Sequence, residues 1–163
     1  MHFSLLDRID ELVPQKSLTA SKTPSMSEEY LLDHFPLFPV MPGVLMLESM
    51  YQSAAWLIRH DDDFSHSLVL LKEAKNIKYV GFVKPGQRLT VHVELIKREG
   101  SLSRFKAKGM VDDKVVVSGR LVLEHSNLAD NEPVKKSTDQ CIIRSLRKSF
   151  GNLYPQAPVE LAS

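Results

Sequence analysis

The apolar positions of this chain follow two patterns, one helical and one strand-like. Residues 44–58 contain no proline or glycine and are apolar on nearly every side, which favours a helix buried in a core. The run is too short to cross a bilayer, which takes roughly 20 residues. Further along, Leu89, Val91, Val93 and Leu95 alternate with polar residues, as in a strand with one buried face.

The second half of the chain predicts a series of antiparallel strands. Runs rich in β-branched and aromatic residues are separated by short polar segments with glycine, proline or aspartate. We expect strands at residues 67–71, 77–83, 89–95, 105–110 and 115–123, with turns at 84–87, 99–101 and 112–113. One long apolar helix against consecutive strands indicates an α+β domain whose sheet wraps around the helix.

The residues that flank the long helix are less regular. Residues 3–23 predict a short helix or lead-in followed by strand, with a turn at Pro14 and Gln15. A small helix is expected after residue 27, with Ser25 or Ser27 as its N-cap. The sequence RHDDD at residues 59–63 is typical of a solvated loop, because its aspartates lack the spacing and the glycine of a calcium site.

Composition narrows the class of protein. The 163 residues suit one folded domain, and the formal net charge of +1 argues against a dedicated nucleic-acid binder. Cys141 is the only cysteine in the sequence, which excludes an internal disulfide and a cysteine-based metal cluster and favours a reducing compartment. The first residues, MHFSLLDRIDEL, do not resemble a signal peptide, and no transmembrane segment is expected. We therefore expect a cytoplasmic protein.

The last part of the chain differs in composition from the rest. We expect a folded domain over residues 1–125, and a linker with a short amphipathic extension over residues 126–163. In the extension, apolar residues between Cys141 and Phe150 recur at helical spacing among basic ones. Such a helix can pack on the domain surface, or it can dock an acidic partner or a membrane surface.

The segment HFPLFPVMPGVLMLESMYQ, residues 34–52, carries the candidate chemistry. Its three prolines make the first part a rigid, extended loop, and the buried helix follows. Glu48 lies inside that apolar helix, where an unpaired carboxylate costs several kcal/mol. Gln52, at i+4, lies on the same face and can hold the carboxyl group. The two can simply complete hydrogen bonds, or Glu48 can form an acid/base pair with His34, which the loop holds close to the helix.

This segment resembles the signature of the β-hydroxyacyl-acyl carrier protein dehydratases of fatty acid synthesis. The family pattern is roughly HFP-x-x-P-x-x-PGV-x-x-x-E-x-x-x-Q, and the chain matches it without a gap. The strand segments VKPGQRLTVHVEL and MVDDKVVVSGRLVLE extend the resemblance to about residue 124. It implies an α+β hotdog fold, in which an antiparallel sheet wraps around one long central helix.

The resemblance also implies roles for individual residues. His34 and Glu48 would be the catalytic pair, contributed by opposite subunits of a homodimer that can assemble further. The backbone N–H groups of Gly43 and Val44 would bind the thioester oxygen at the start of the helix. Gln52 would orient the Glu48 carboxyl.

The implied reaction is dehydration of a 3-hydroxyacyl thioester to a trans-2-enoyl thioester, with acyl carrier protein or coenzyme A as the carrier and no metal or cofactor. The acyl chain would occupy a tunnel beside Met46, Met50 and Tyr51. Three residues depart from the family pattern: Asp33 and Leu37 replace glycines, and Tyr51 replaces a small residue. Two alternatives stay open, namely a hotdog acyl thioesterase and a non-catalytic acyl-thioester binding protein whose site these larger residues have closed.

Overall fold

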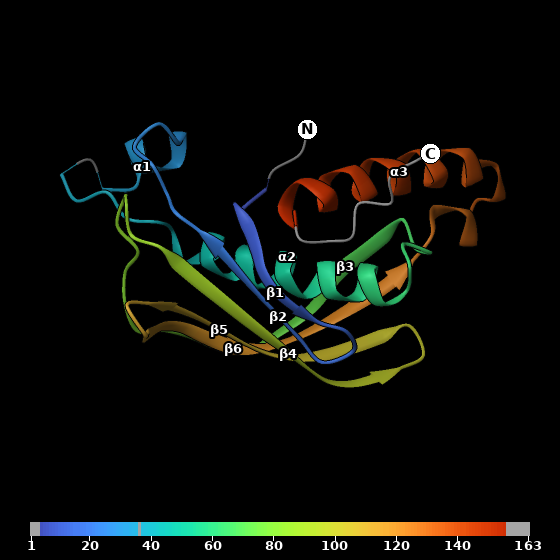
Figure 1. Cartoon of the computed structure of the whole chain (residues 1–163), viewed down its shortest axis with the longest axis horizontal. Coiled ribbons are helices and arrows are strands. Elements are labelled where there is room, and N and C mark those ends of the chain that lie inside the picture. Colours follow the sequence, from blue (N-terminus) through green and yellow to red (C-terminus); the bar gives the residue numbers. More distant parts are fainter. Residues whose placement is uncertain (1–3, 36, 156–163) are drawn as a thin grey trace.

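Figure 1 shows a curved sheet that wraps around the long helix α2 in this computed structural model. The structure describes residues 4–35 and 37–155. The strands are β1 (Arg8–Val13), β2 (Ser17–Lys22), β3 (Leu68–Tyr79), β4 (Leu89–Glu99), β5 (Leu102–Val111) and β6 (Lys114–Ser126). The helices are α1 (Glu29–Asp33), α2 (Gly43–Asp61) and α3 (Lys136–Leu153), with two 3-10 turns, η1 (Leu128–Asp130) and η2 (Pro133–Lys135).

The six strands form one antiparallel sheet in the order β1-β2-β4-β5-β6-β3. The tight connections expected after β3, β4 and β5 are present, and each contains residues with left-handed backbone. Gly86, Gly100, Asp112 and Asp113 have φ values of 84°, 57°, 51° and 62°. One sheet around one long helix confirms the predicted α+β architecture.

Helix α2 is apolar on nearly every side because two layers cover it. Met50, Ala54 and Leu57 are completely buried in a core that also holds the inward-facing residues of the strands. On the side away from the sheet, α3 lies along α2 (Figure 1), and the rings of Phe150 and Trp56 meet at a centroid distance of 5.9 Å. Helix α2 is therefore the middle layer of the domain.

One expectation about the strands was wrong. The apolar runs at residues 67–71 and 77–83 do not form two strands, because β3 passes through both with bulges against β6. Asn76 has φ 54° and lies in one bulge, which breaks the alternation by which a single strand is recognised. At the N-terminus, where a short helix or a lead-in was considered before a strand, β1 and β2 form a hairpin, and the expected turn is present at Gln15 (φ 60°).

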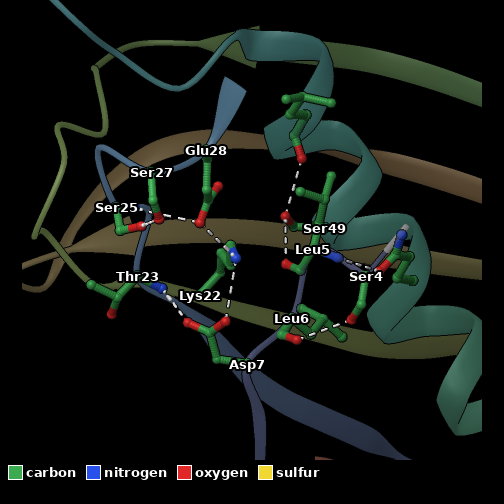
Figure 2. A network of polar contacts seen from close by, with 12 residues as sticks. Ser4, Leu5, Leu6, Asp7, Lys22, Thr23, Ser25, Ser27, Glu28 and Ser49 are labelled. Carbon is green, nitrogen blue, oxygen red and sulfur yellow. Dashed lines mark hydrogen bonds and ion pairs between the residues drawn. The ribbon is translucent and has the colours of Figure 1, made fainter. Parts of the chain in front are cut away.

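Helix α1 begins without the cap that the sequence predicts. Its N-cap is Glu28, whose side chain makes no capping hydrogen bond, while the hydroxyls of Ser25 and Ser27 bond to each other at 2.6 Å. Figure 2 shows why: the Glu28 carboxylate turns to Lys22 on β2, with Oε1 3.0 Å from Nζ. The side chain of the N-cap residue thus makes a tertiary ion pair and no local cap.

The expected solvated loop at residues 59–63 is largely helical, since α2 continues to Asp61. Both carboxylate oxygens of Asp61 accept from the backbone N–H of Gln15 in the β1–β2 turn, at 3.0 and 3.1 Å. Asp62 accepts two hydrogen bonds of 2.8 Å from Arg98 on β4. These acids hold the end of α2 against two hairpins, and partners that distant in sequence leave no local signal.

The expected polar linker, residues 127–139, is folded as well. The buried Asp139 organises it by accepting the Ser67 hydroxyl and the backbone N–H groups of Leu128 and Ala129, the latter two at 2.9 Å. Burial alone would raise the pKa of Asp139, but these hydrogen bonds hold it below its usual value of 3.8. Ser67 lies 72 residues away in sequence, so the polar composition of this region concealed its order.

The predicted amphipathic helix is present as α3, longer than expected. Its Phe150 lies among the rings of Trp56, His60, Phe64 and Tyr154, at centroid distances of 5.9, 5.7, 5.5 and 5.8 Å. Of the roles considered for this helix, the contacts support packing on the domain. Within residues 4–35 and 37–155, no helix combines the length and hydropathy needed to cross a bilayer.

Candidate active site

His34 lies in the loop between α1 and α2, and one side of its ring is fixed. Its Nδ1 lies 3.1 Å from the carbonyl oxygen of Val40. A carbonyl can only accept, so Nδ1 carries the proton and Nε2 of the neutral ring is free to accept one. The next residue, Phe35, has φ 60°, a backbone conformation that is uncommon for a bulky residue. The centroid of its ring lies 4.4 Å from that of the His34 ring, so Phe35 packs against the histidine.

The predicted pairing of Glu48 with Gln52 is confirmed. Gln52 donates from Nε2 to Glu48 Oε1 at 3.1 Å, and its Oε1 accepts from the backbone N–H of Leu5 at 2.8 Å. Ser49 adds a second tie, because its hydroxyl donates to the carbonyls of Leu5 and Leu45 at 3.1 and 3.0 Å. Figure 2 shows this N-terminal segment lying against α2. The glutamate is thus oriented by an amide that the chain's own N-terminal segment holds in place.

Gly43 is the first residue of α2, directly after the N-cap Pro42. The first N–H groups of a helix lack acceptors within it and carry the positive end of the helix dipole. A Cβ on Gly43 would lie 3.0 Å from the ring of Tyr79, so glycine lets β3 approach the helix start. Val44 follows and is 66% exposed. The helix start is thus open beside Val44, and the binding of a developing negative charge by the amides of Gly43 and Val44 stays a prediction.

A cavity of about 390 Å³ lies beside Glu48, between α2, α3 and the N-terminal segment. Helix α2 contributes Glu48, Tyr51, Gln52, Ala55, Trp56 and Arg59, and the other walls are Ser4, Leu146, Ser149, Asn152 and Leu153. Met46 and Met50 are buried in the core and are not among its lining residues, so their place in an acyl tunnel stays a prediction. The residues of α3 in this wall belong to the extension, for which the resemblance implied no role.

Tyr51 both lines this cavity and packs against the sheet. Its hydroxyl donates to the carbonyl of Val69 on β3, and the residue lines the cavity together with Glu48 and Gln52. Burial raises the pKa of Tyr51, which keeps the hydroxyl a neutral donor. The residue therefore narrows the cavity from a position that the sheet fixes.

One chain presents the two candidate catalytic groups separately. His34 does not line the cavity beside Glu48, and among the described residues no hydrogen bond or ion pair joins the two side chains. Each has its own support, Val40 for the histidine and Gln52 for the glutamate. A proton relay between them needs either a second chain or a substrate that bridges them.

Exposed apolar side chains gather near His34 and the start of α2. Leu37 is 101% exposed, Val80 67% and Phe82 60%, and the ring of Phe38 meets Phe82 edge-on at 5.9 Å. Leu37, one of the departures from the family pattern, is thus fully exposed. The nearby strand β3 ends the sheet order, so its outer edge is free of neighbours in the described chain. Large apolar surfaces and open edges of this kind mark interfaces.

Asp62, His66 and His125 place one ligand atom each within 4.8 Å of one another, as a metal site would. Asp62, however, already accepts two hydrogen bonds from Arg98, and this guanidinium lowers the pKa of the Asp62 carboxyl. Because Arg98 supplies the cation that the carboxylate needs, we assign no metal to this cluster.

Arg59 and Trp56 are site residues that the sequence reasoning missed. Arg59 was placed in a solvated loop, whereas it lines the cavity with its guanidinium 4.9 Å from the centroid of the Trp56 ring. The spacing of the sequence predicts this position, because Glu48, Gln52 and Arg59 stand at i, i+4 and i+11, on one face of a helix. Arg59 was missed because the predicted helix ended at residue 58.

Comparison with known proteins identifies the family of the chain. The sequence pattern of the FabA-like domain family matches residues 1–120. The chain belongs to the FabA-like family of β-hydroxyacyl-acyl carrier protein dehydratases. The 3-hydroxyacyl-[acyl-carrier-protein] dehydratase FabZ of Pediococcus pentosaceus is 39% identical over 116 residues, which cover 71% of this chain and 78% of the relative. That of Anaeromyxobacter sp. is 37% identical over 134 residues, covering 80% and 83%.

Solved structures place the chain in the hotdog fold. A chain of the dehydratase heterocomplex ApeI:P from Xenorhabdus doucetiae superposes with a TM-score of 0.63 at 18% identity, covering 82% of this chain and 90% of that one. Cj0977, a sigma28-regulated virulence protein from Campylobacter jejuni, gives 0.59 at 12% identity, with coverage of 77% and 80%. At such identities the likeness concerns the fold alone. The family and the fold that the signature implied are both confirmed.

Proposed function

We propose that this protein removes water from 3-hydroxyacyl thioesters, with acyl carrier protein as the carrier, to give trans-2-enoyl thioesters in fatty acid synthesis. Relatives that cover most of the chain are named as dehydratases of this kind. The observation that carries the proposal is that His34 and Glu48 are each held by a dedicated partner, Val40 and Gln52. Their side chains are positioned for chemistry in a way that core packing does not require.

His34 takes the proton from C2 of the substrate. The Val40 carbonyl holds the proton on Nδ1, which leaves Nε2 as the base. The electron pair released at C2 moves toward the thioester carbonyl, whose oxygen gains negative charge. The first N–H groups of α2, those of Gly43 and Val44, stabilise that charge through hydrogen bonds and the helix dipole.

Glu48 assists the departure of the C3 hydroxyl. Its carboxyl group, protonated or proton-sharing through a water, delivers a proton so that the hydroxyl leaves as water while the C2–C3 double bond forms. Gln52 keeps the carboxyl pointed into the cavity. The C2 proton ends on His34 and the leaving oxygen gains one from Glu48, so the chain is reset by proton exchange with solvent.

The proposal includes a homodimer whose active sites take His34 from one chain and Glu48 from the other. Two observations support it. Among the described residues, no hydrogen bond or ion pair joins the two side chains, and the chain has exposed apolar residues such as Leu37 and Val80 and a free edge at β3. A second chain would cover both the patch and the edge. The cytoplasm stays the expected compartment.

Activity of single and mixed variants tests the proposal. His34→Ala and Glu48→Gln should each lower kcat/KM for a 3-hydroxyacyl thioester by about 10²–10⁴-fold with an unchanged circular dichroism spectrum. If chains exchange, a mixture of the two inactive proteins should regain activity, because hybrid dimers contain one intact site. Losses below tenfold for both variants, or exchange without recovery, would contradict the shared site.

The substrate panel separates the alternatives. Formation of the enoyl thioester from the 3-hydroxy substrate identifies a dehydratase, and release of free thiol from a saturated thioester identifies a thioesterase. Tight binding without turnover of either substrate would identify an acyl-thioester binding protein. Comparing acyl carrier protein with coenzyme A as the carrier tests the carrier assignment.

A further inference from the structure

The cavity beside Glu48 has an ionisable side chain at each end of one helical stripe. Glu48 and Arg59 stand eleven residues apart on α2, which places them within about 20° of the same face and roughly 16 Å apart along the axis. Gln52 and Ala55 lie between them, and all four residues line the cavity. At that separation the two side chains cannot bond to each other, so Glu48 does not occupy the N–H donors of Arg59.

The side chain of Arg59 loses hydration at this position, which costs free energy. Burial lowers the pKa of its guanidinium below the usual value, although the group stays charged at neutral pH. Its Nε is buried without a hydrogen-bond partner, and among the described residues its side chain makes no hydrogen bond or ion pair. Its guanidinium lies over the face of the Trp56 ring, 4.9 Å from the centroid, which attracts a cation but satisfies none of its N–H donors. A half-buried cation whose Nε is buried and unpaired needs an acceptor.

The wall around Arg59 is polar on the side of α3. Ser149 and Asn152 line the cavity there, with Leu146 and Leu153 on the same helix face. An alkyl chain alone would gain nothing from a guanidinium, a hydroxyl and an amide at its end, and it would leave their hydrogen bonds unmade. The α3 residues lie beyond residues 1–120, so this end of the cavity is built by the part of the chain outside the FabA-like match.

We infer that the end of this cavity at Arg59 is an anion subsite, which receives an acyl chain that ends in a carboxylate. The inference rests on the proposed function and deepens it by naming the substrate class: 3-hydroxyacyl thioesters with a negatively charged terminal group. The reacting carbons lie at Glu48, the chain follows Gln52 and Ala55, and the terminal carboxylate binds the guanidinium of Arg59. Carboxylate is the acceptor that suits a guanidinium best, because two parallel N–H groups can bind its two oxygens.

The test compares matched 3-hydroxyacyl thioesters of equal length that end in a carboxylate or in a methyl group. The wild type should prefer the carboxylate, and Arg59→Met should lower the ratio of the two kcat/KM values by about 10- to 100-fold, the range of one charge-assisted hydrogen bond. Arg59→Lys keeps the charge without the two-pronged geometry and should lie between them. Arg144→Met removes the same charge from an exposed position on α3 and should leave the ratio unchanged.

A binding measurement makes the result independent of turnover. Calorimetric titration with the saturated thioesters, which cannot be dehydrated, should show the same carboxylate preference in the wild type and its loss in Arg59→Met. Dehydration of both substrates with no carboxylate preference, or a preference that survives in Arg59→Met, overturns the subsite and leaves the dehydratase assignment standing. If neither 3-hydroxy substrate is dehydrated but the Arg59-dependent binding persists, the proposed reaction fails and the subsite stands.

Discussion

Truncating Phe150 tests whether α3 is an integral layer of the domain. The side chain is only 8% exposed and lies among the rings of Trp56, His60 and Phe64, all on or just after α2. Replacing a buried phenylalanine with alanine costs about 3–5 kcal/mol through lost burial and the cavity that remains. Since whole domains are stable by about 5–15 kcal/mol, Phe150→Ala should remove a large part of the free energy of unfolding.

The chain carries its own probe for this experiment. Trp56 is the only tryptophan in the sequence, is 7% exposed and contacts Phe150 directly. Urea titrations followed by Trp56 fluorescence and by far-ultraviolet circular dichroism should shift together if α3 unfolds with the sheet. Phe150→Leu should cost less than about 1.5 kcal/mol because it keeps an apolar side chain of similar volume. Cys141→Ala, at an exposed site on the same helix, should change stability by less than about 0.5 kcal/mol.

Two results would refute this reasoning. A loss below about 1 kcal/mol for Phe150→Ala would mean that the aromatic cluster does not anchor the helix. A shift in the Trp56 signal alone, with the circular dichroism transition of the sheet unmoved, would mean that α3 detaches by itself. In that case hydrogen exchange in α3 would be fast and the wall of the Glu48 cavity would be mobile.

Three further predictions follow from single contacts. Tyr51→Phe removes the hydroxyl that donates to Val69 and should lower stability by about 0.5–1.5 kcal/mol while leaving the preferred acyl length unchanged; a changed length ranking in the substrate panel would mean that the hydroxyl itself limits the cavity. Gln52→Ala leaves the backbone N–H of Leu5 without its acceptor and should cost about 1–3 kcal/mol in urea titrations, so a change within about 0.5 kcal/mol would contradict the role of this tie. Burial, followed by the neighbouring His66 charge, lowers the pKa of His125 below 6.5, so the unfolded chain binds more protons than the folded one in the window just below that pH. Stability should therefore fall as pH decreases from 7 through that window, and His125→Asn should flatten the decline in melting curves; an equal decline in both proteins would assign it elsewhere.

The parts of the fold that could be predicted are those that local pattern determines. The run at residues 44–58 has the composition of a buried helix, and it lies within α2, which continues to Asp61. The alternation around Val91 and Val93 appears as β4. Glu48 and Gln52 were paired from their spacing because i and i+4 are neighbours on any helix. The signature residues needed no folding argument at all, since they were recognised as a set.

What the sequence concealed depends on partners far along the chain. Residues 127–139 looked like a linker because nothing local shows that Asp139 is buried against Ser67. The end of α2 looked like a loop because Asp61 and Asp62 are polar, and their partners lie on other hairpins. Polar residues satisfied by distant elements have the composition of solvated ones, and this similarity produced each of these errors.

The extent of α2 also changes how its polar residues are understood. A helix over residues 44–58, as predicted, has one polar pair, Glu48 and Gln52, among apolar residues. The observed helix continues to Asp61, so it has a polar stripe that includes Arg59 and faces a cavity rather than the sheet. That stripe would destabilise a helix enclosed by the sheet alone, because each unpaired charge would be buried in apolar surroundings. Helix α3 and the N-terminal segment give the stripe walls with hydrogen-bonding groups, and the space left between them has room for a ligand.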